Sequence, residues 1–156
     1  MAERFKEPVK WRRIEIAVDS GACESVVDPD ELPDHSVKET KASKSDDEFV
    51  SATADPIPSM GEMNIVMKTR EATMRAMTFT AAPVAKPLGS VKRICQAGHI
   101  VVFDEDGSYI YNNHTGEVNV LREEMGNYIM DVWVAPPDLN EQAASEQARS
   151  FPWQSP

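Results

Sequence analysis

Short apolar segments recur along this chain, and clusters of turn-forming residues separate them. Residues 11–18 alternate apolar and polar side chains, as a strand with one buried face does, and run into the turn-forming Asp19-Ser20-Gly21. This two-residue period predicts a mainly β fold, because it gives each strand one face to bury in a core. Further strand signals lie at residues 25–27, 49–53, 63–67, 72–79, 99–103, 108–111, 117–121 and 128–134.

One segment near the middle of the chain has the features of a helix. Residues 91–97 form the best short helical pattern, and Gly98 follows them, where a glycine commonly ends a helix. The next strand signals are separated by the hairpin-forming clusters at 104–107 and 112–116. The sequence therefore predicts one short helix, followed by a C-terminal β-meander at about 99–134.

The length and the polar ends of the chain define the domain. With 156 residues the chain is long enough for one domain but not comfortably for two. Residues 1–10 are polar and predict a loose lead-in, whereas 135–156 are rich in Pro, Glu, Gln, Ser and Ala and predict a disordered tail or linker. The predicted domain is therefore 11–134. Within it, residues 34–48 are almost free of apolar side chains and predict a surface loop.

The charge and the distribution of apolar residues narrow the classes of function. A formal net charge of −10 argues against nucleic-acid binding, because phosphates attract Lys and Arg and repel an acidic surface. No apolar stretch approaches the length of a membrane span, and the charged start of the chain lacks the apolar core of a signal peptide. We therefore expect an intracellular, cytoplasmic protein without membrane contact.

The residues that usually bind metals do not form a recognisable pattern. Cys23 and Cys95 lie in different contexts without the spacing of a metal site, and the three histidines are scattered. Cys23 is expected to be a small buried residue. The acidic cluster at 104–107 lacks the later ligands of a calcium loop, so a hairpin turn is the better interpretation. No metal site and no cofactor are predicted.

The tripeptide Asp19-Ser20-Gly21 is the candidate for chemistry. A carboxylate that ends an apolar strand lies at a buried edge, where its ionisation responds to desolvation and to neighbouring charges. Gly21 permits a sharp turn of the backbone, and the hydroxyl group of Ser20 can brace that turn. The tripeptide alone is also common in plain surface turns, so its context decides between a turn and an active site.

That context resembles the active-site signature of the retropepsin-like aspartic proteases. Residues 14–22, Ile-Glu-Ile-Ala-Val-Asp-Ser-Gly-Ala, are similar to the strand and the Asp-Thr/Ser-Gly-Ala of that family. Ser-Val-Val at 25–27, followed by Leu-Pro, resembles the short strand after the signature. Residues 82–89, Ala-Pro-Val-Ala-Lys-Pro-Leu-Gly, look like the second hallmark, where two apolar residues and a glycine enter a helix beside the active-site loop.

Beyond Gly89 the closer likeness is to the protease ends of Copia-type retrotransposon polyproteins. Residues 88–94 resemble the helix of those proteases, and residues 98–110 resemble the hairpin that follows it. The resemblance covers about residues 11–134, and it rests on several short motifs that occur in the family's order. It implies a small closed retropepsin-like β-barrel with the short helix, followed by the meander.

The resemblance also implies an activity. Enzymes of this type are aspartic endopeptidases that hydrolyse polypeptides with an activated water, and the substrates can include their own polyprotein. The mechanism needs two aspartates, whereas this chain contains one Asp-Ser-Gly, so the resemblance implies a homodimer in which each copy contributes Asp19. The other residues it assigns are Ser20, Gly21 and Ala22 in the active-site loop, and Leu88 and Gly89 in the second hallmark.

Two features of the chain depart from the family pattern. The flap that covers the substrate would lie within 49–58, with its tip at Ala52, Thr53, Ala54 and Asp55, and this tip has no glycine although retroviral flap tips are rich in it. Ser90 stands where the family often has a charged residue. Two alternatives therefore remain open: a catalytically inactive retropepsin-like module for dimerisation or peptide binding, and a decayed fragment of a retrotransposon polyprotein.

Overall fold

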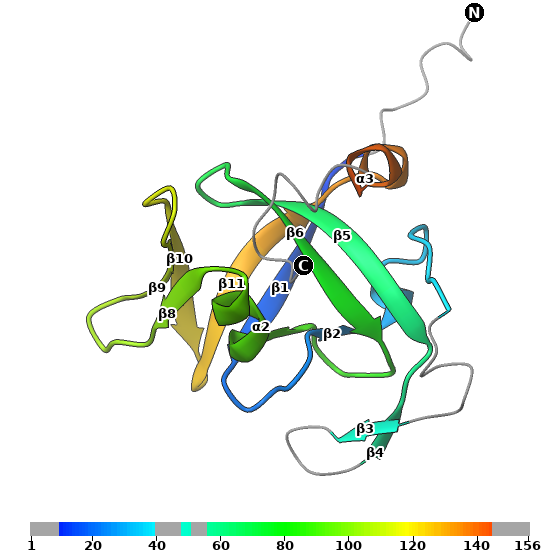
Figure 1. The fold of residues 1–156 in the computed structure, drawn as a ribbon, viewed down its shortest axis with the longest axis horizontal. Helices are drawn as coiled ribbons and strands as arrows, with labels where there is room; N and C mark the ends of the chain where they lie inside the picture. The colour runs from blue at the N-terminus through cyan, green and yellow to red at the C-terminus, as the bar shows by residue number, and fades with distance from the viewer. Residues whose placement is uncertain (1–9, 40–47, 51–55, 145–156) are drawn as a thin grey trace, which may run out of the picture.

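The computed structural model describes residues 10–39, 48–50 and 56–144, and over these residues the chain is mainly β, as predicted (Figure 1). Its strands are β1 (Arg12–Asp19), β2 (Val26–Val27), β3 (Glu48–Val50), β4 (Pro56–Pro58), β5 (Gly61–Thr69), β6 (Met74–Ala81), β7 (Leu88–Ser90), β8 (His99–Val102), β9 (Ser108–Asn112), β10 (Val118–Glu124) and β11 (Asn127–Val134). Within the described residues, nine of these strands form one sheet in the order β1-β7-β2-β6-β5-β11-β10-β9-β8, and β3 and β4 form a second, two-stranded sheet. The helical elements are η2 (Pro29–Glu31), α2 (Val91–Gln96) and α3 (Pro137–Ala144).

The strand β1 is paired on both sides. It runs antiparallel to β11 over residues 12–17 and parallel to β7 over residues 17–19. Ile14, Ile16 and Val18 are buried in the main core, which explains the alternation in this segment. The predicted strand is thus confirmed, and it carries the chain to Asp19 with little freedom to move, because both of its edges are hydrogen-bonded to neighbours.

The strands β5 and β6, which contain the predicted strand signals at 63–67 and 72–79, form a long antiparallel hairpin. Met63, Met67 and Met77 pack with Ile65 and Phe79 in the core, where all five side chains are buried. Methionine side chains are unbranched and flexible, so they fill an irregular space between sheet layers well. The hairpin therefore contributes many of the core side chains that share one cluster with Ile14, Ile16 and Val18 of β1.

The helix α2 forms where the sequence predicts it. The side chain of Ser90 caps its first turn by accepting a hydrogen bond from the N–H of Arg93, and Ala97 ends it. Gly98 follows with φ +98°, a backbone conformation in which a side chain is strained. This turn leads the chain directly into β8.

The predicted meander is present, and its last strand belongs to the main sheet. The strands β8, β9 and β10 pair in sequence order, and β10 continues onto β11. On the same edge β11 then pairs with β5 through residues 132–134, and on its opposite edge it pairs with β1 over residues 129–134. The meander is therefore not an appendage that follows the domain, since the strand that carries Asp19 depends on β11 for one of its two edges.

The helix α3 corrects the prediction of a disordered tail from residue 135 onward and adds a second α-helix to the one predicted. Its Asn140 is buried, with Oδ1 accepting a 2.7 Å hydrogen bond from the N–H of Val66 and Nδ2 donating a 2.9 Å bond to the carbonyl oxygen of Asn64. The polar composition concealed this helix because a buried amide and the small side chain of Ala143, and not a broad apolar face, hold it against the domain. Residues 145–156 and most of the predicted lead-in, 1–9, lie outside the described residues.

The first part of the predicted surface loop at 34–48 is tied to the domain. The Nε2 atom of His35 donates a 2.9 Å hydrogen bond to the carbonyl oxygen of Ala135. Lys38 and Glu62 form an isolated antiparallel bridge, with 2.8 Å backbone hydrogen bonds in both directions. The predicted loop is therefore bonded to the domain as far as Lys38, and residues 40–47 lie outside the described part of the chain.

Candidate active site

Asp19 is the last residue of β1 and is partly exposed. Its Oδ1 atom accepts a 2.7 Å hydrogen bond from the main-chain N–H of Gly21, which closes a tight turn around Ser20. Ser20 and Gly21 are exposed, whereas Ala22 is buried. The carboxylate is therefore oriented by its own loop and accessible at the end of a strand anchored in the core.

The strand β7 brings the second predicted hallmark to this loop. In the parallel register between the two strands, Gly89 lies opposite Val18 and Ser90 lies opposite Asp19. A Cβ atom added to Gly89 would lie 3.0 Å from Cγ2 of Ile16, which is tighter than ordinary van der Waals contact. A glycine therefore allows β7 to lie this close to β1, and the two hallmarks meet at one place in the fold.

Two buried serines, Ser25 and Ser90, stabilise the inner side of the loop through hydrogen bonds. The hydroxyl group of Ser90 donates a 2.7 Å hydrogen bond to the carbonyl oxygen of Ala22, and the N–H of Ser90 donates a 3.0 Å bond to Oγ of Ser25. Sequence reasoning treated Ser90 only as a departure from the family pattern. A serine directly before a helix commonly caps it, so the sequence could have predicted the hydrogen bond from the N–H of Arg93 to Ser90. Its bond to Ala22 spans 68 residues and has no local signal.

An ion pair joins the helix α2 to the same loop. Nη2 and Nε of Arg93 donate hydrogen bonds to the two carboxylate oxygens of Glu24, the second at 3.2 Å. The hydrogen bond with Glu24 raises the pKa of Arg93 above its ordinary value. Sequence reasoning missed this pair, because its members are 69 residues apart.

The remaining residue of the loop, Cys23, is exposed and not buried as expected. The neighbouring Ala22 and Ser25 are directed into the protein, and Cys23 lies on the outer side of the bend between them. Cys95 is exposed as well, and neither cysteine is in a disulfide. Of the two carboxylates in the loop, Glu24 is in the ion pair with Arg93, and Asp19 lies at the end of β1. A single carboxylate can act as a general base or as a general acid, but not as both in the same step.

The residues predicted for the flap tip, Ala52 to Asp55, lie outside the described residues. The strands on either side of them do pair, because β3 and β4 run antiparallel with residue 49 opposite residue 57. The predicted flap segment thus has the two-stranded base that a hairpin requires.

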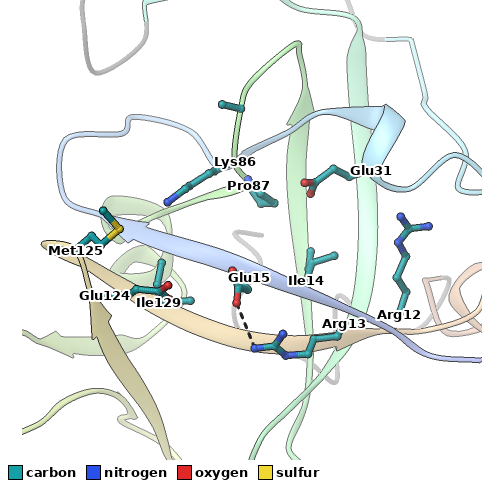
Figure 2. A pocket seen from close by; sticks show the side chains of 11 residues that line it. Arg12, Arg13, Ile14, Glu15, Glu31, Lys86, Pro87, Glu124, Met125 and Ile129 are labelled. Atoms are coloured by element: carbon teal, nitrogen blue, oxygen red, sulfur yellow. Dashed lines mark hydrogen bonds and ion pairs between the residues drawn. The ribbon is translucent and has the colours of Figure 1, made fainter.

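A separate hollow of about 500 Å³ lies along β1 (Figure 2), and Asp19 is not among the residues that line it. Arg13 and Glu15 form an ion pair at its rim, with 3.2 Å between Nη2 and Oε2. Desolvation raises the pKa of Glu31, another residue of the lining. The lining also includes Arg12, Lys86 and Glu124, so charges of both signs surround the hollow. It contains no Ser, Cys or His nucleophile or base, and we assign no reaction to it.

Other kinds of site receive no support within the described residues. No three His, Cys, Asp or Glu side chains among them come together in a way that would hold a metal ion. No helix in this part of the chain is long and apolar enough to cross a membrane. Comparisons of the chain with protein-family models, with curated proteins and with solved structures find no match. A functional conclusion must therefore rest on the Asp19 loop and its surroundings.

Proposed function

We propose that this chain is an aspartic endopeptidase of the retroviral and retrotransposon type, in which Asp19 from two copies forms the catalytic pair. The observation that carries the proposal is the parallel register of β1 and β7, with Ser90 opposite Asp19. This register places Asp19-Ser20-Gly21 beside Leu88 and Gly89, two motifs that are about 70 residues apart in the chain and that belong together in the resemblance.

The strand pairings support the closed barrel that this function implies. They run from β1 through β7, β2, β6, β5 and β11 and then return to β1. A ring of pairings of this kind restrains the Asp19 loop, because the strand that carries it has a bonded neighbour on each side. Precise placement of a catalytic carboxylate depends on such a rigid support.

The proposed mechanism uses the two carboxylates in different protonation states. The ionised Asp19 of one copy takes a proton from a water molecule, whose oxygen then attacks the carbonyl carbon of the peptide. The protonated Asp19 of the other copy donates its proton to the carbonyl oxygen. The C–N bond of the tetrahedral intermediate then breaks: the leaving nitrogen takes a proton from the first carboxyl group, and the second carboxylate takes back a proton from a hydroxyl group of the intermediate, which becomes the new carboxyl group. Two carboxylates this close share one proton and titrate as a unit, so turnover should be favoured at mildly acidic pH.

Cleavage of a polypeptide is the direct test of this proposal. The purified chain is incubated with a mixed peptide library, with and without an inhibitor that mimics the transition state of aspartic proteases. We expect inhibitor-sensitive cleavage. Asp19→Asn should abolish it and keep the fold, because an amide has the shape of the carboxyl group but cannot act as a base. Asp30→Asn is the matched control, since Asp30 is an exposed carboxylate outside the loop, and it should cleave normally. Undiminished cleavage by Asp19→Asn would remove Asp19 from the mechanism.

The requirement for two copies predicts that specific activity depends on protein concentration. Specific activity should fall on dilution below the dimer dissociation constant, because a separated copy holds only one of the two carboxylates. An excess of Asp19→Asn mixed with the wild-type chain should suppress activity by forming inactive mixed dimers. Constant specific activity from a chain that sediments as a monomer would refute the shared site.

The rival function is that of a retropepsin-like module that binds peptides without cleaving them. The sequence of the flap tip, Ala52 to Asp55, favours it because the tip lacks glycine. Peptides that bind the wild-type chain and are recovered intact after prolonged incubation across acidic and neutral pH would support this rival over the protease.

A further inference from the structure

The strands β8, β9 and β10 lie at one side of the molecule (Figure 1), and their outward face carries apolar side chains in two rows. The strand pairings place these side chains opposite one another: Ile100, Tyr111 and Val118 in the first row, and Val102, Tyr109 and Val120 in the second. We call these six residues the meander face. Four of them are between 37% and 53% exposed.

Such a face is unusual for a sheet whose other side packs on a core. Ile110 and Leu121, which alternate with residues of the meander face along β9 and β10, are buried in the main core. An antiparallel sheet with one side on the core normally carries polar side chains on the other. Adjacent apolar side chains that remain exposed on such a sheet indicate a surface that binds another molecule.

The segment that carries the meander face is strongly acidic. Residues 99–124 contain six Asp or Glu residues, one Arg and no Lys, so their formal charge is −5, half of the −10 of the whole chain. Asp104, Glu105 and Asp106 are exposed together in the turn that joins β8 to β9. This turn connects Val102 to Tyr109, a cross-strand pair of the second row. The turn therefore places three carboxylates at one end of the meander face.

A further carboxylate is fixed at the edge of β10. Glu71, in the turn between β5 and β6, accepts a 3.0 Å hydrogen bond from the N–H of Val120 and a 3.1 Å bond from Nδ2 of Asn119. Desolvation favours the neutral form of Glu71, but these hydrogen bonds outweigh it and hold its pKa below the ordinary value. An ionised carboxylate is therefore held beside the meander face at neutral pH.

Two arginines that adjoin this surface are paired with carboxylates of their own. Arg122 continues the outward side of β10 beyond Val120, and it is bonded to Asp131 at 2.8 Å and to Glu124. Arg75 forms a 2.8 Å ion pair with Glu117, the residue before β10. In the described part of the chain, neither Glu71 nor the acidic turn has a Lys or Arg in an ion pair with it. These carboxylates are therefore available to cations of another molecule.

We propose that the meander face binds a segment of another polypeptide that combines apolar side chains with Lys and Arg. Its apolar side chains pack on the six residues, and its cations pair with Glu71 and with the turn between β8 and β9. The acidic charge opposes other occupants, because it repels nucleic acids, anionic lipid surfaces and a second copy of this chain. The proposal goes beyond the proposed function, since it requires neither Asp19 nor a dimer.

The two kinds of contact have different roles. Exposed ion pairs add little affinity, but charges of opposite sign speed association and select the partner. The affinity therefore comes mainly from the apolar contacts at the centre, where residues that lose their water dominate binding. A partner that carries apolar side chains without cations, or cations without apolar side chains, should bind weakly.

Affinity selection from three pools of short peptides tests the chemistry of the partner. The first pool is built from Lys, Arg, Leu, Val and Phe, the second from Asp, Glu, Leu, Val and Phe, and the third from Lys, Arg, Ser and Gly. We expect the immobilised wild-type chain to retain peptides of the first pool about tenfold better than those of the other two. Equal retention of the first and second pools, or retention of no pool, would overturn the proposal.

A matched pair of variants shows where a retained peptide binds. Val118→Lys and Leu139→Lys each place a cation at a similarly exposed apolar position, at 41% on the meander face and at 40% on α3. Fluorescence anisotropy with a labelled peptide of the first pool measures the dissociation constant. Val118→Lys should raise it by about tenfold or more, because it brings a like charge into an apolar contact, and Leu139→Lys should leave it unchanged.

Neutralising the acidic turn tests the charged part of the surface. The combined substitutions Asp104→Asn, Glu105→Gln and Asp106→Asn should weaken binding by about threefold to tenfold at low salt, and added salt should reduce the difference. The control removes three exposed carboxylates elsewhere on the chain: Asp30→Asn, Asp34→Asn and Glu141→Gln. It has the same net charge as the first variant and should bind like the wild type.

The outcomes of these measurements are separate from those for the protease. Circular dichroism and thermal unfolding show whether each variant keeps its fold, and Ile100→Ser replaces Val118→Lys if the latter does not fold. A folded variant of the meander face that binds like the wild type, or equal weakening by both triple variants, would overturn the proposal. Mass spectrometry of the recovered peptide reads cleavage independently, so binding of an intact peptide would uphold the surface even if the chain cleaves nothing.

Discussion

The hydroxyl group of Ser90 donates a 2.7 Å hydrogen bond to the carbonyl oxygen of Ala22, while the same oxygen atom accepts a 3.2 Å bond from the N–H of Arg93. One buried atom thus links the Asp19 loop to the first turn of α2. The loop has no regular secondary structure after Asp19, so bonds of this kind replace the strand pairing that holds β1. The position of the candidate catalytic carboxylate therefore depends on a residue far from it in sequence.

Replacing Ser90 by alanine should weaken this link. Ser90→Ala removes the helix cap and leaves the buried carbonyl group of Ala22 without this donor, so we expect a loss of about 1–3 kcal/mol in the free energy of unfolding. Urea denaturation measures it. Ser36→Ala, at an exposed position, is the control and should change stability by less than about 0.5 kcal/mol. Equal stability of the two variants would show that the Ser90 hydroxyl group does not support the loop.

Asp131 is a buried carboxylate on β11 that three arginines surround. It accepts hydrogen bonds from Arg13 at 2.6 Å, Arg70 at 2.9 Å and Nε of Arg122 at 2.8 Å. Asp131→Asn keeps the shape but leaves the three cations without their shared partner. Because the arginines are partly exposed and water can solvate them, we expect a loss of about 1–3 kcal/mol at neutral pH, less than for a fully buried pair.

The effect of Asp131 should depend on pH. The hydrogen bond from Arg122 is the main cause that holds the pKa of Asp131 below its ordinary value. The unfolded chain therefore binds a proton here at higher pH than the folded chain, so this carboxylate stabilises the fold above about pH 4 and the stabilisation disappears as the pH falls through its lowered pKa. The stability difference between wild type and Asp131→Asn should shrink in acid. Asp106→Asn, in an exposed turn, is the control for the substitution itself and should change the free energy of unfolding at neutral pH by less than about 0.5 kcal/mol.

His99 should make the fold less stable in mild acid. Its ring is buried, and desolvation is the main cause that lowers its pKa to about 4, with a smaller contribution from the nearby charge of Arg75. The unfolded chain binds a proton at this histidine near pH 6.5, so between about pH 6.5 and 4 the stability falls with falling pH, by up to roughly 3 kcal/mol.

A variant isolates this contribution from that of other titrating groups. His99→Gln retains a polar side chain beside the carbonyl oxygen of Ile94, which lies 3.3 Å from Nδ1 of His99, but it does not titrate. Urea unfolding across this pH range should therefore show a flatter dependence for His99→Gln than for wild type. Parallel curves for the two chains would mean that His99 takes up its proton in the folded protein as readily as in the unfolded one.

Gly61 should tolerate no side chain. Its φ is +132°, and an added Cβ atom would lie 2.2 Å from the carbonyl oxygen of Lys38. Gly107 is the matched control, because its φ is +153° and an added Cβ would have no atom within 4 Å. We expect Gly61→Ala to cost about 2–4 kcal/mol, since strain and overpacking combine, and Gly107→Ala to cost about 1 kcal/mol from strain alone. Thermal unfolding of the two variants compares these costs, and similar midpoints would contradict the steric explanation.

The sequence by itself determined the elements of this protein whose cause is local. The alternation before Asp19 predicted β1 because a two-residue period leaves one face to bury. A glycine at position 98 marked the end of α2, and the turn clusters separated the strands of the meander. The candidate carboxylate could also be named from sequence, since Asp19-Ser20-Gly21 lies in one stretch of chain.

Only the tertiary structure decided how these elements meet. It paired β11 with β1, and it fixed α3 to β5 through Asn140, where the sequence had indicated a tail. Register also decided which side chains of the meander lie side by side, because a shift of one residue between β8 and β9 would change which of them point outward together. The hydrogen bond from Ser90 to Ala22 is likewise a contact that only the tertiary structure shows. Such contacts join residues far apart in the chain, and a local pattern carries no information about which distant partner will be adjacent after folding.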